Sequence, residues 1–330
     1  MSHLVQCTRS GAKYGWANTW AIVASHLFKY PFFDFSSRYA NVTGTSLVDG
    51  YRSLGRAAIT SLTVLVITSS PVITAAVGLT TGAFVDNLLS LGEDGLFGQG
   101  STVAVLYLCC SLVLLSGQFS LLDGLIKAIT ALLVLCTLAA LGAALVAVPR
   151  TPLGTQTASL TQHLVLNGTA APIDDEVVAA ADPWDDGGIR FLVALMGWMP
   201  VPLDTGSIAS SLWTVERYRT SGLHPSLRET LVEFGAGYVL TAALALVFLA
   251  LGVLLLHDSG EALPEGSAAL AAAVVGLYSR SLGAWAVPVV ATAASCAMLG
   301  TCITILDAYA RILSRSLQVA STTPWQLHFP

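Results

Sequence analysis

Apolar stretches of membrane length recur along this chain and constrain its fold more than any other feature. The segments at about 57–85, 231–256 and 283–307 consist almost entirely of aliphatic and small residues. Of the 330 residues, 54% are hydrophobic and only 11% are charged, whereas a soluble domain is about one quarter charged. The mean hydropathy is +0.71. Because an apolar helix of about 20 residues crosses a bilayer, we expect an all-α polytopic membrane protein surrounded by lipid.

Glycines and charged breaks divide the chain into about eight transmembrane segments within one domain, 1–330. The expected helical segments lie at about 3–13, 17–36, 57–85, 101–117, 122–148, 188–218, 231–256, 266–279 and 283–307. The longest connection, at about 149–187, is rich in Thr, Ala and Asp and shows no strong periodicity. We expect this connection to form a loop outside the cytoplasm.

Lysine and arginine are distributed unevenly between alternate loops. One set of loops holds nine of these residues: Arg38, Arg52, Arg56, Lys127, Arg217, Arg219, Arg228, Arg311 and Arg315. The other set holds four: Lys13, Arg150, Arg190 and Arg280. Because basic loops stay in the cytoplasm, the first set predicts the cytoplasmic side. We expect an integral protein of the plasma (inner) membrane.

The sequence carries no motif of a membrane enzyme. It has no HExxH, no paired His–Asp cluster and no nucleophilic serine elbow. The six cysteines lie mostly within apolar runs without the spacing of a metal knuckle, so we interpret them as small core residues. We therefore expect neither an enzyme nor a resident cofactor, and no nucleic acid as a partner.

Two prolines interrupt the apolar segment at about 188–218 near its middle. Pro200 and Pro202 lack backbone donors and disfavour helix at the residue before each of them. We expect a short extended stretch at 199–203, with freed carbonyls near Met199, between two half-helices. Unwound backbone at membrane depth persists only where it lines protein or water. Discontinuous helices of this kind mark the substrate site in many secondary transporters.

Several residues near the expected break have both a structural and a functional interpretation. Asp204 either caps the second half-helix or faces a cation. Met199 either offers a thioether ligand or fills a gap in the core. Ser2 and His3 lie where the corresponding broken helix of a first repeat would be. His3 qualifies as a ligand only if a half-helix precedes it, and otherwise belongs to a solvated N-terminus.

Two parts of the chain resemble the NRAMP family of divalent-metal transporters. The run SGAKYGWANTW, continuing to NVTGTSLVDGYR, resembles the end of that family's first helix, the start of its second and the amphipathic cytoplasmic segment that follows. GWMPVPLD, at 197–204, resembles the Met-Pro-His signature of its broken sixth helix. The resemblance implies a LeuT-like fold of two inverted five-helix repeats, with helices 1 and 6 discontinuous and the metal bound between them.

On this resemblance the first repeat spans about 1–148 and an incomplete second repeat spans about 188–330. The family's fold implies half of helix one before Met1 and at least two helices after the last span, so the chain is expected to be short at both ends.

The match to the family's ligands is incomplete. Met199 and Pro200 match the helix-six signature, but Val201 stands where the family has His. Ser2 and His3 align with the Gly and Asn of the family's Asp-Pro-Gly-Asn signature, and its Asp would precede this chain. These departures predict an altered metal site.

We expect a secondary transporter of divalent metal cations, Mn/Fe-like or of altered selectivity, that works by alternating access. The metal is cargo, and protons are a candidate coupling ion. The expected contacts to the metal are Met199, Asp204, His3 and Ser2, with Trp198 as a wall of the site. Two alternatives stay open: a transporter of the same fold for a small organic solute such as an amino acid, and a membrane metal-binding protein without transport.

Overall fold

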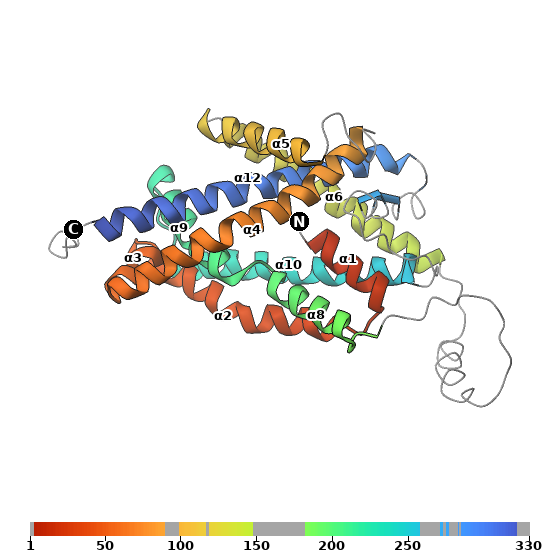
Figure 1. Cartoon of the computed structure of the whole chain (residues 1–330), viewed down its shortest axis with the longest axis horizontal. Helices are drawn as coiled ribbons and strands as arrows, with labels where there is room; N and C mark the ends of the chain where they lie inside the picture. The colour runs from red at the N-terminus through yellow and green to blue at the C-terminus, as the bar shows by residue number, and fades with distance from the viewer. Residues whose placement is uncertain are drawn as a thin grey trace.

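The described residues of this chain form a bundle of helices without a β-strand. The structure, a computed structural model, describes residues 3–89, 99–116, 119–147, 182–257, 271–272, 275–276, 283 and 285–321. Figure 1 shows the helices arranged as an elongated bundle, with α8 and α9 following each other along its length. The helices are α1 (His3–Tyr14), α2 (Thr19–Thr43), α3 (Leu47–Ser53), α4 (Arg56–Leu89), α5 (Gln99–Leu115), α6 (Phe119–Ala147), α8 (Asp186–Trp198), α9 (Leu203–Ser221), α10 (Leu227–Leu255) and α12 (Ala286–Ser321).

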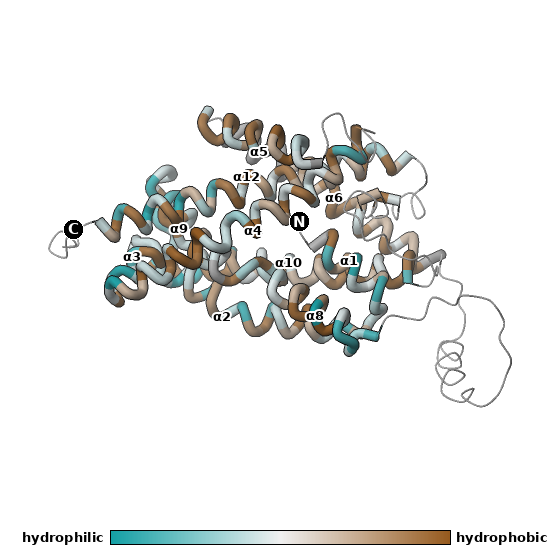
Figure 2. Tube along the Cα trace, viewed as in Figure 1, coloured by the Kyte–Doolittle hydropathy of each residue, from teal (hydrophilic) through white to brown (hydrophobic). Residues whose placement is uncertain are grey.

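Three of these helices, α4, α10 and α12, are long and apolar enough to cross a membrane. Shorter apolar stretches lie at Gly100–Leu115 in α5 and Ala131–Leu145 in α6. Figure 2 shows apolar residues along the bodies of the helices and hydrophilic residues gathered toward the ends of the bundle. Large apolar side chains such as Phe28 and Val193 are exposed, as expected of a surface that faces lipid. The predicted class, an all-α membrane protein, is confirmed, whereas the number of spans and the inverted repeats stay predictions.

Two helices extend further than the sequence predicted. Helix α2 continues to Thr43 and ends where Gly44 adopts a left-handed conformation, with φ 65°. Helix α12 continues to Ser321 because its last turns still bury Ile312 and Val319, although charged residues alternate with them. The predicted small-residue helix at 266–279 falls mostly outside the described residues, as does the loop at 149–187 up to residue 181.

The short helix α3 is the predicted amphipathic segment after α2. Polar contacts fix it at the end of the bundle where Arg52, Arg219, Arg311 and Arg315 lie, which we call the basic end. Ser46 and Asp49 form a capping box at its start. Asp49 also accepts hydrogen bonds from the Arg315 guanidinium of α12, with Nη2 at 2.5 Å. The buried Arg52 donates from Nε to the Val319 carbonyl at 2.9 Å. These contacts tie the loop between α2 and α4 to the end of α12.

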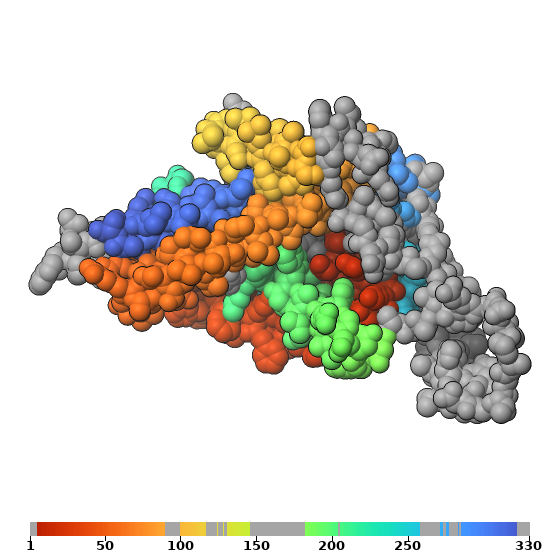
Figure 3. Space-filling model, in the orientation of Figure 1, coloured from red at the N-terminus to blue at the C-terminus, as the bar shows by residue number. Residues whose placement is uncertain are grey.

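Helices α4 and α12 lie side by side across the face drawn in Figure 3. Their buried surface is mostly aliphatic, and two hydroxyl contacts cross it. Ser295 donates to the Phe84 carbonyl at 3.0 Å, and the Cys302 thiol donates to Thr81 Oγ1 at 3.2 Å. Polar contacts of this kind add to the van der Waals packing that associates helices in lipid.

Helices α1 and α10 cross at two glycines, Gly11 and Gly252. A Cβ atom at Gly11 would collide with the Leu249 carbonyl, and one at Gly252 would collide with the Thr8 carbonyl. Because both neighbours are backbone atoms, no side-chain rotation can relieve either clash. Small residues of this kind let helix backbones approach closely in a membrane.

The crossing predicts that Gly252→Ala destabilises the protein. The added methyl group meets fixed backbone, so we expect the free energy of unfolding to fall by about 1–3 kcal/mol. The measurement is thermal or detergent-induced unfolding of the purified protein. The control is Gly235→Ala in the same helix, where a Cβ would meet nothing within 4 Å and alanine favours the helix. Equal stability of the two variants would contradict the close approach of α1 and α10 at Gly252.

Candidate functional site

The helix break that the prolines predict lies at residues 199–202, between α8 and α9. Met199 has extended backbone, with φ −86° and ψ 136°, and its N–H makes the last hydrogen bond of α8, to the Leu195 carbonyl at 3.0 Å. Helix α9 resumes with Gly206 N–H bonding to the Pro202 carbonyl at 3.0 Å. Since Pro200 and Pro202 have no N–H, they cannot continue the hydrogen-bond ladder. The predicted break is therefore confirmed.

Met199 is fully buried at the break and contacts helix α1. The Cys7 thiol approaches the Met199 thioether, with 3.6 Å between the two sulfur atoms, and both side chains are 0% exposed. The burial of Cys7, Cys110 and Cys302 confirms the interpretation of these cysteines as core residues, whereas Cys109 is exposed and the interpretation is wrong for it. The sequence did not reveal the contact, because the two residues are 192 positions apart.

The Lys29 side chain of α2 also reaches the break. Its ammonium donates to the Gly197 carbonyl, with Nζ at 2.6 Å, and to the Val201 carbonyl at 3.3 Å. These two carbonyls lie on either side of Met199 along the chain. Sequence reasoning did not assign Lys29 to the site. The signal was present, because a lysine inside an apolar helix is costly unless it finds partners.

Trp198 lines a small cavity of about 30 Å³ beside the break, together with Gln6 of α1, Thr80 of α4 and Met298 of α12. Its indole N–H is buried and has no hydrogen-bond partner in the described part of the chain. A cavity of this size holds about one water molecule. Trp198 thus lies at the junction of four helices, α1, α4, α8 and α12, and its role as a wall of a metal site stays a prediction.

Of the remaining predicted ligands, Asp204 and His3 are placed only through their backbone. Asp204 is the second residue of α9, and Pro202 is the N-cap, without a side-chain cap. His3 is the first residue of α1. The side chains of Asp204 and His3, and the whole of Ser2, lie outside the described residues. No cluster of three or more His, Cys, Asp or Glu occurs among the residues that the structure describes, so the metal ligands stay a prediction.

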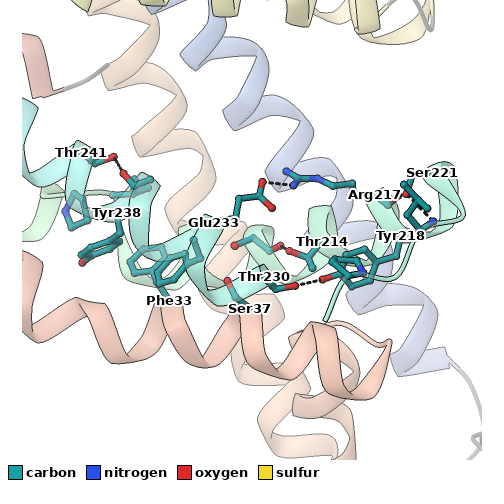
Figure 4. Close-up of a pocket in the computed structure, with 17 residues that line it drawn as sticks. Phe33, Ser37, Thr214, Arg217, Tyr218, Ser221, Thr230, Glu233, Tyr238 and Thr241 are labelled. Carbon is teal, nitrogen blue, oxygen red and sulfur yellow. Dashed lines mark hydrogen bonds and ion pairs between the residues drawn. The ribbon is translucent and has the colours of Figure 1, made fainter. Parts of the chain in front are cut away.

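A cavity of about 610 Å³ extends from the break toward the basic end of the bundle, between α2, α9 and α10. Pro200 and Val201 line it at the break, and the Arg217–Glu233 ion pair, at 2.6 Å, lines it at the other end. Figure 4 shows the rings of Phe33 and Tyr238 next to each other on one part of its wall and the hydroxyl-bearing Thr214, Tyr218 and Thr230 grouped on another.

Asn41 holds the three helices of this cavity together. Its amide nitrogen lies 3.0 Å from each of three acceptors, Tyr218 Oη, the Pro225 carbonyl and Thr230 Oγ1, which share its two N–H donors. Tyr218 and Thr230 are themselves hydrogen-bonded at 3.0 Å. The network fixes the end of α2 against the connection between α9 and α10.

A second cavity, of about 500 Å³, lies between α3, α9 and α12 at the same end. Its lining is charged and includes the Asp49–Arg315 pair together with Glu216 and Arg219. The cavity does not reach the break, and its opposite charges nearly balance.

These features define a helical membrane protein whose interior contains an interrupted helix. The chain belongs to the same family as the uncharacterized protein PM0681 of Pasteurella multocida. The two are 34% identical over 321 residues, which cover 96% of this chain and 67% of that protein. No family model matches the chain.

The cavity predicts that a water-soluble reagent reaches Thr214, which lines it. We expect Thr214→Cys to be labelled by a charged, membrane-impermeant thiol reagent, whereas Thr137→Cys, fully buried in α6, stays unlabelled. Peptide mass mapping separates the introduced thiol from the exposed Cys109. If the reagent labels Thr214→Cys no more than Thr137→Cys, the cavity between α2, α9 and α10 is not accessible to water.

Proposed function

We propose that this protein is a secondary transporter of divalent metal cations in the plasma (inner) membrane, and that it is a divergent NRAMP-related protein with a LeuT-like fold. The observation that carries the proposal is the break at 199–202, where the Met199 thioether is buried inside the bundle. Interrupted helices supply substrate ligands in many secondary transporters, because their freed backbone groups and side chains meet near the middle of the membrane.

The groups around the break support a cation as cargo. First-row divalent metals accept a mixture of carboxylate, carbonyl, thioether and imidazole ligands. Met199 offers the thioether, and we propose that Asp204, His3 and Ser2 complete the set, with Trp198 as the wall. The metal passes through the protein as substrate, and protons are the candidate coupling ion.

The cavity between α2, α9 and α10 supports release of the cargo at the basic end, which the loop charges assign to the cytoplasm. It reaches the break at Pro200 and Val201. Alternating access requires one part of a transporter to rock against another around a fixed site. We propose that α8 and α9 move relative to each other about the break, because the unwound residues 199–202 separate the two helices.

One observation favours a second candidate, the transport of a small solute with a carboxylate, such as an amino acid. Pro202, the N-cap residue of α9, makes no side-chain hydrogen bond to the helix, and the Lys29 ammonium lies at the same break. A helix N-terminus and an ammonium both attract a negative group. Binding of a labelled amino acid, with no response to metals, would favour this candidate.

The test of the proposal is metal uptake into proteoliposomes. We expect at least one of Mn²⁺, Fe²⁺, Co²⁺, Cd²⁺ and Mg²⁺ to accumulate, and Met199→Ala to reduce uptake at least about tenfold because a ligand is lost. The control is Met196→Ala, one turn earlier in α8 and only partly buried. Failure of all five ions to accumulate would refute metal transport, whereas metal binding without flux would indicate a binding protein.

A further inference from the structure

The second cavity, between α3, α9 and α12 at the basic end, has the size of a ligand site. Its volume is about 500 Å³, and ligand pockets of proteins measure roughly 300–1,000 Å³. Figure 1 shows α3 and α9 beside the C-terminal part of α12. One charged pair in its lining is already engaged, because one oxygen of Asp49 accepts from Arg315 and the other accepts from Ser46.

Three further charged side chains in the lining offer groups for a ligand. Glu216 and Arg219 lie three residues apart on α9, and within the described part of the chain no hydrogen bond or ion pair engages the carboxylate of one or the guanidinium of the other. Arg311 of α12 donates to both Asp307 oxygens at 2.8 Å through Nε, which leaves its terminal amino groups for another partner. The cavity therefore presents two cationic groups and one anionic group.

The length of α12 places this cavity near a membrane surface. The helix is apolar enough to cross a membrane and contains 36 residues, whereas about 20 residues cross the hydrocarbon core. Counted from Ala286, the hydrocarbon part ends near Ile305. The next two turns, with Arg311, then lie among the lipid headgroups. Charged pockets between membrane helices at this level bind the headgroups of lipids.

The signs of the charges select the kind of headgroup. Guanidinium groups bind phosphate with charge-assisted hydrogen bonds, so Arg219 and Arg311 suit the phosphate of a phospholipid. The Glu216 carboxylate repels a headgroup that carries only negative charge. It attracts an ammonium, and a primary ammonium also gives it an N–H donor, which a quaternary ammonium lacks.

We propose that the cavity between α3, α9 and α12 binds the headgroup of a phospholipid that carries both a phosphate and a primary ammonium, of the phosphatidylethanolamine type. Arg219 and the terminal amino groups of Arg311 hold the phosphate, and Glu216 holds the ammonium. The bound headgroup joins α9 to α12 at the basic end. This site does not reach the helix break, and the inference is independent of the proposed transport.

The experiment is native mass spectrometry of the full chain, freed of lipid in detergent and titrated with the dioleoyl forms of phosphatidylethanolamine, phosphatidylcholine and phosphatidylglycerol. We expect phosphatidylethanolamine to bind at least about tenfold more tightly than the other two, because it alone donates an N–H group to Glu216. Arg219→Gln should weaken the binding of all three lipids at least about threefold, since each carries the phosphate.

Substitutions of Glu216 test the selectivity. Glu216→Gln should bring the affinities for phosphatidylethanolamine and phosphatidylglycerol within about threefold of each other, and Glu216→Lys should reverse the preference toward phosphatidylglycerol. A reversed preference cannot come from a misfolded protein. Glu233→Gln is the matched control, because Glu233 also lies at the basic end but lines the other cavity, so the wild-type ratio should persist.

Equal affinity of the wild type for the three lipids would overturn the inference, as would a wild-type ratio in Glu216→Gln. Displacement of bound phosphatidylethanolamine by an equimolar amount of free phosphoethanolamine would overturn the assignment to a lipid, because the headgroup alone would then suffice. Each of these outcomes leaves the proposed function standing, since metal uptake is measured separately.

Discussion

The interaction on which the site depends is the pair of hydrogen bonds from the Lys29 ammonium to the Gly197 and Val201 carbonyls. A helix cannot unwind inside a membrane unless its freed backbone groups find partners. Pro200 and Pro202 create the need, and α2 supplies a donor that reaches both sides of the break. The same contact links the joint between α8 and α9 to α2.

Close helix packing holds the other side of the break. Helix α1 approaches α10 through Gly11 and Gly252, and this crossing brings Cys7 to Met199. Helices α4 and α12 close the interior, where Trp198 meets Gln6 and Thr80 at a small cavity. On the α2 side a larger cavity leads away to the basic end. The break thus lies between a tightly packed wall and the larger cavity. On the proposed function, this asymmetry would correspond to one state of an alternating-access cycle.

The sequence predicted the helix break and the long apolar helices, because each depends on residues close together in the chain. Proline acts on its own backbone and on its neighbour, so the break was predicted at 199–203 and occurs at 199–202. Hydropathy identified the long helices α4, α10 and α12 because the apolar character of a segment can be read from its own residues. It did not predict the last turns of α12, because charged residues there alternate with a buried stripe that includes Ile312. Contacts between distant residues, Lys29 with the break and Cys7 with Met199, have no local signal and required the fold.

The most direct test of the central claim is the position of bound metal in an experimental structure. Crystals of the full chain grown with Cd²⁺ would give an anomalous-difference map that locates the ion without assumptions about its ligands. The account predicts a peak within bonding distance of the Met199 sulfur, beside Cys7, with Lys29 still on the Gly197 carbonyl. A peak only at surface carboxylates, with none at the break, would contradict it.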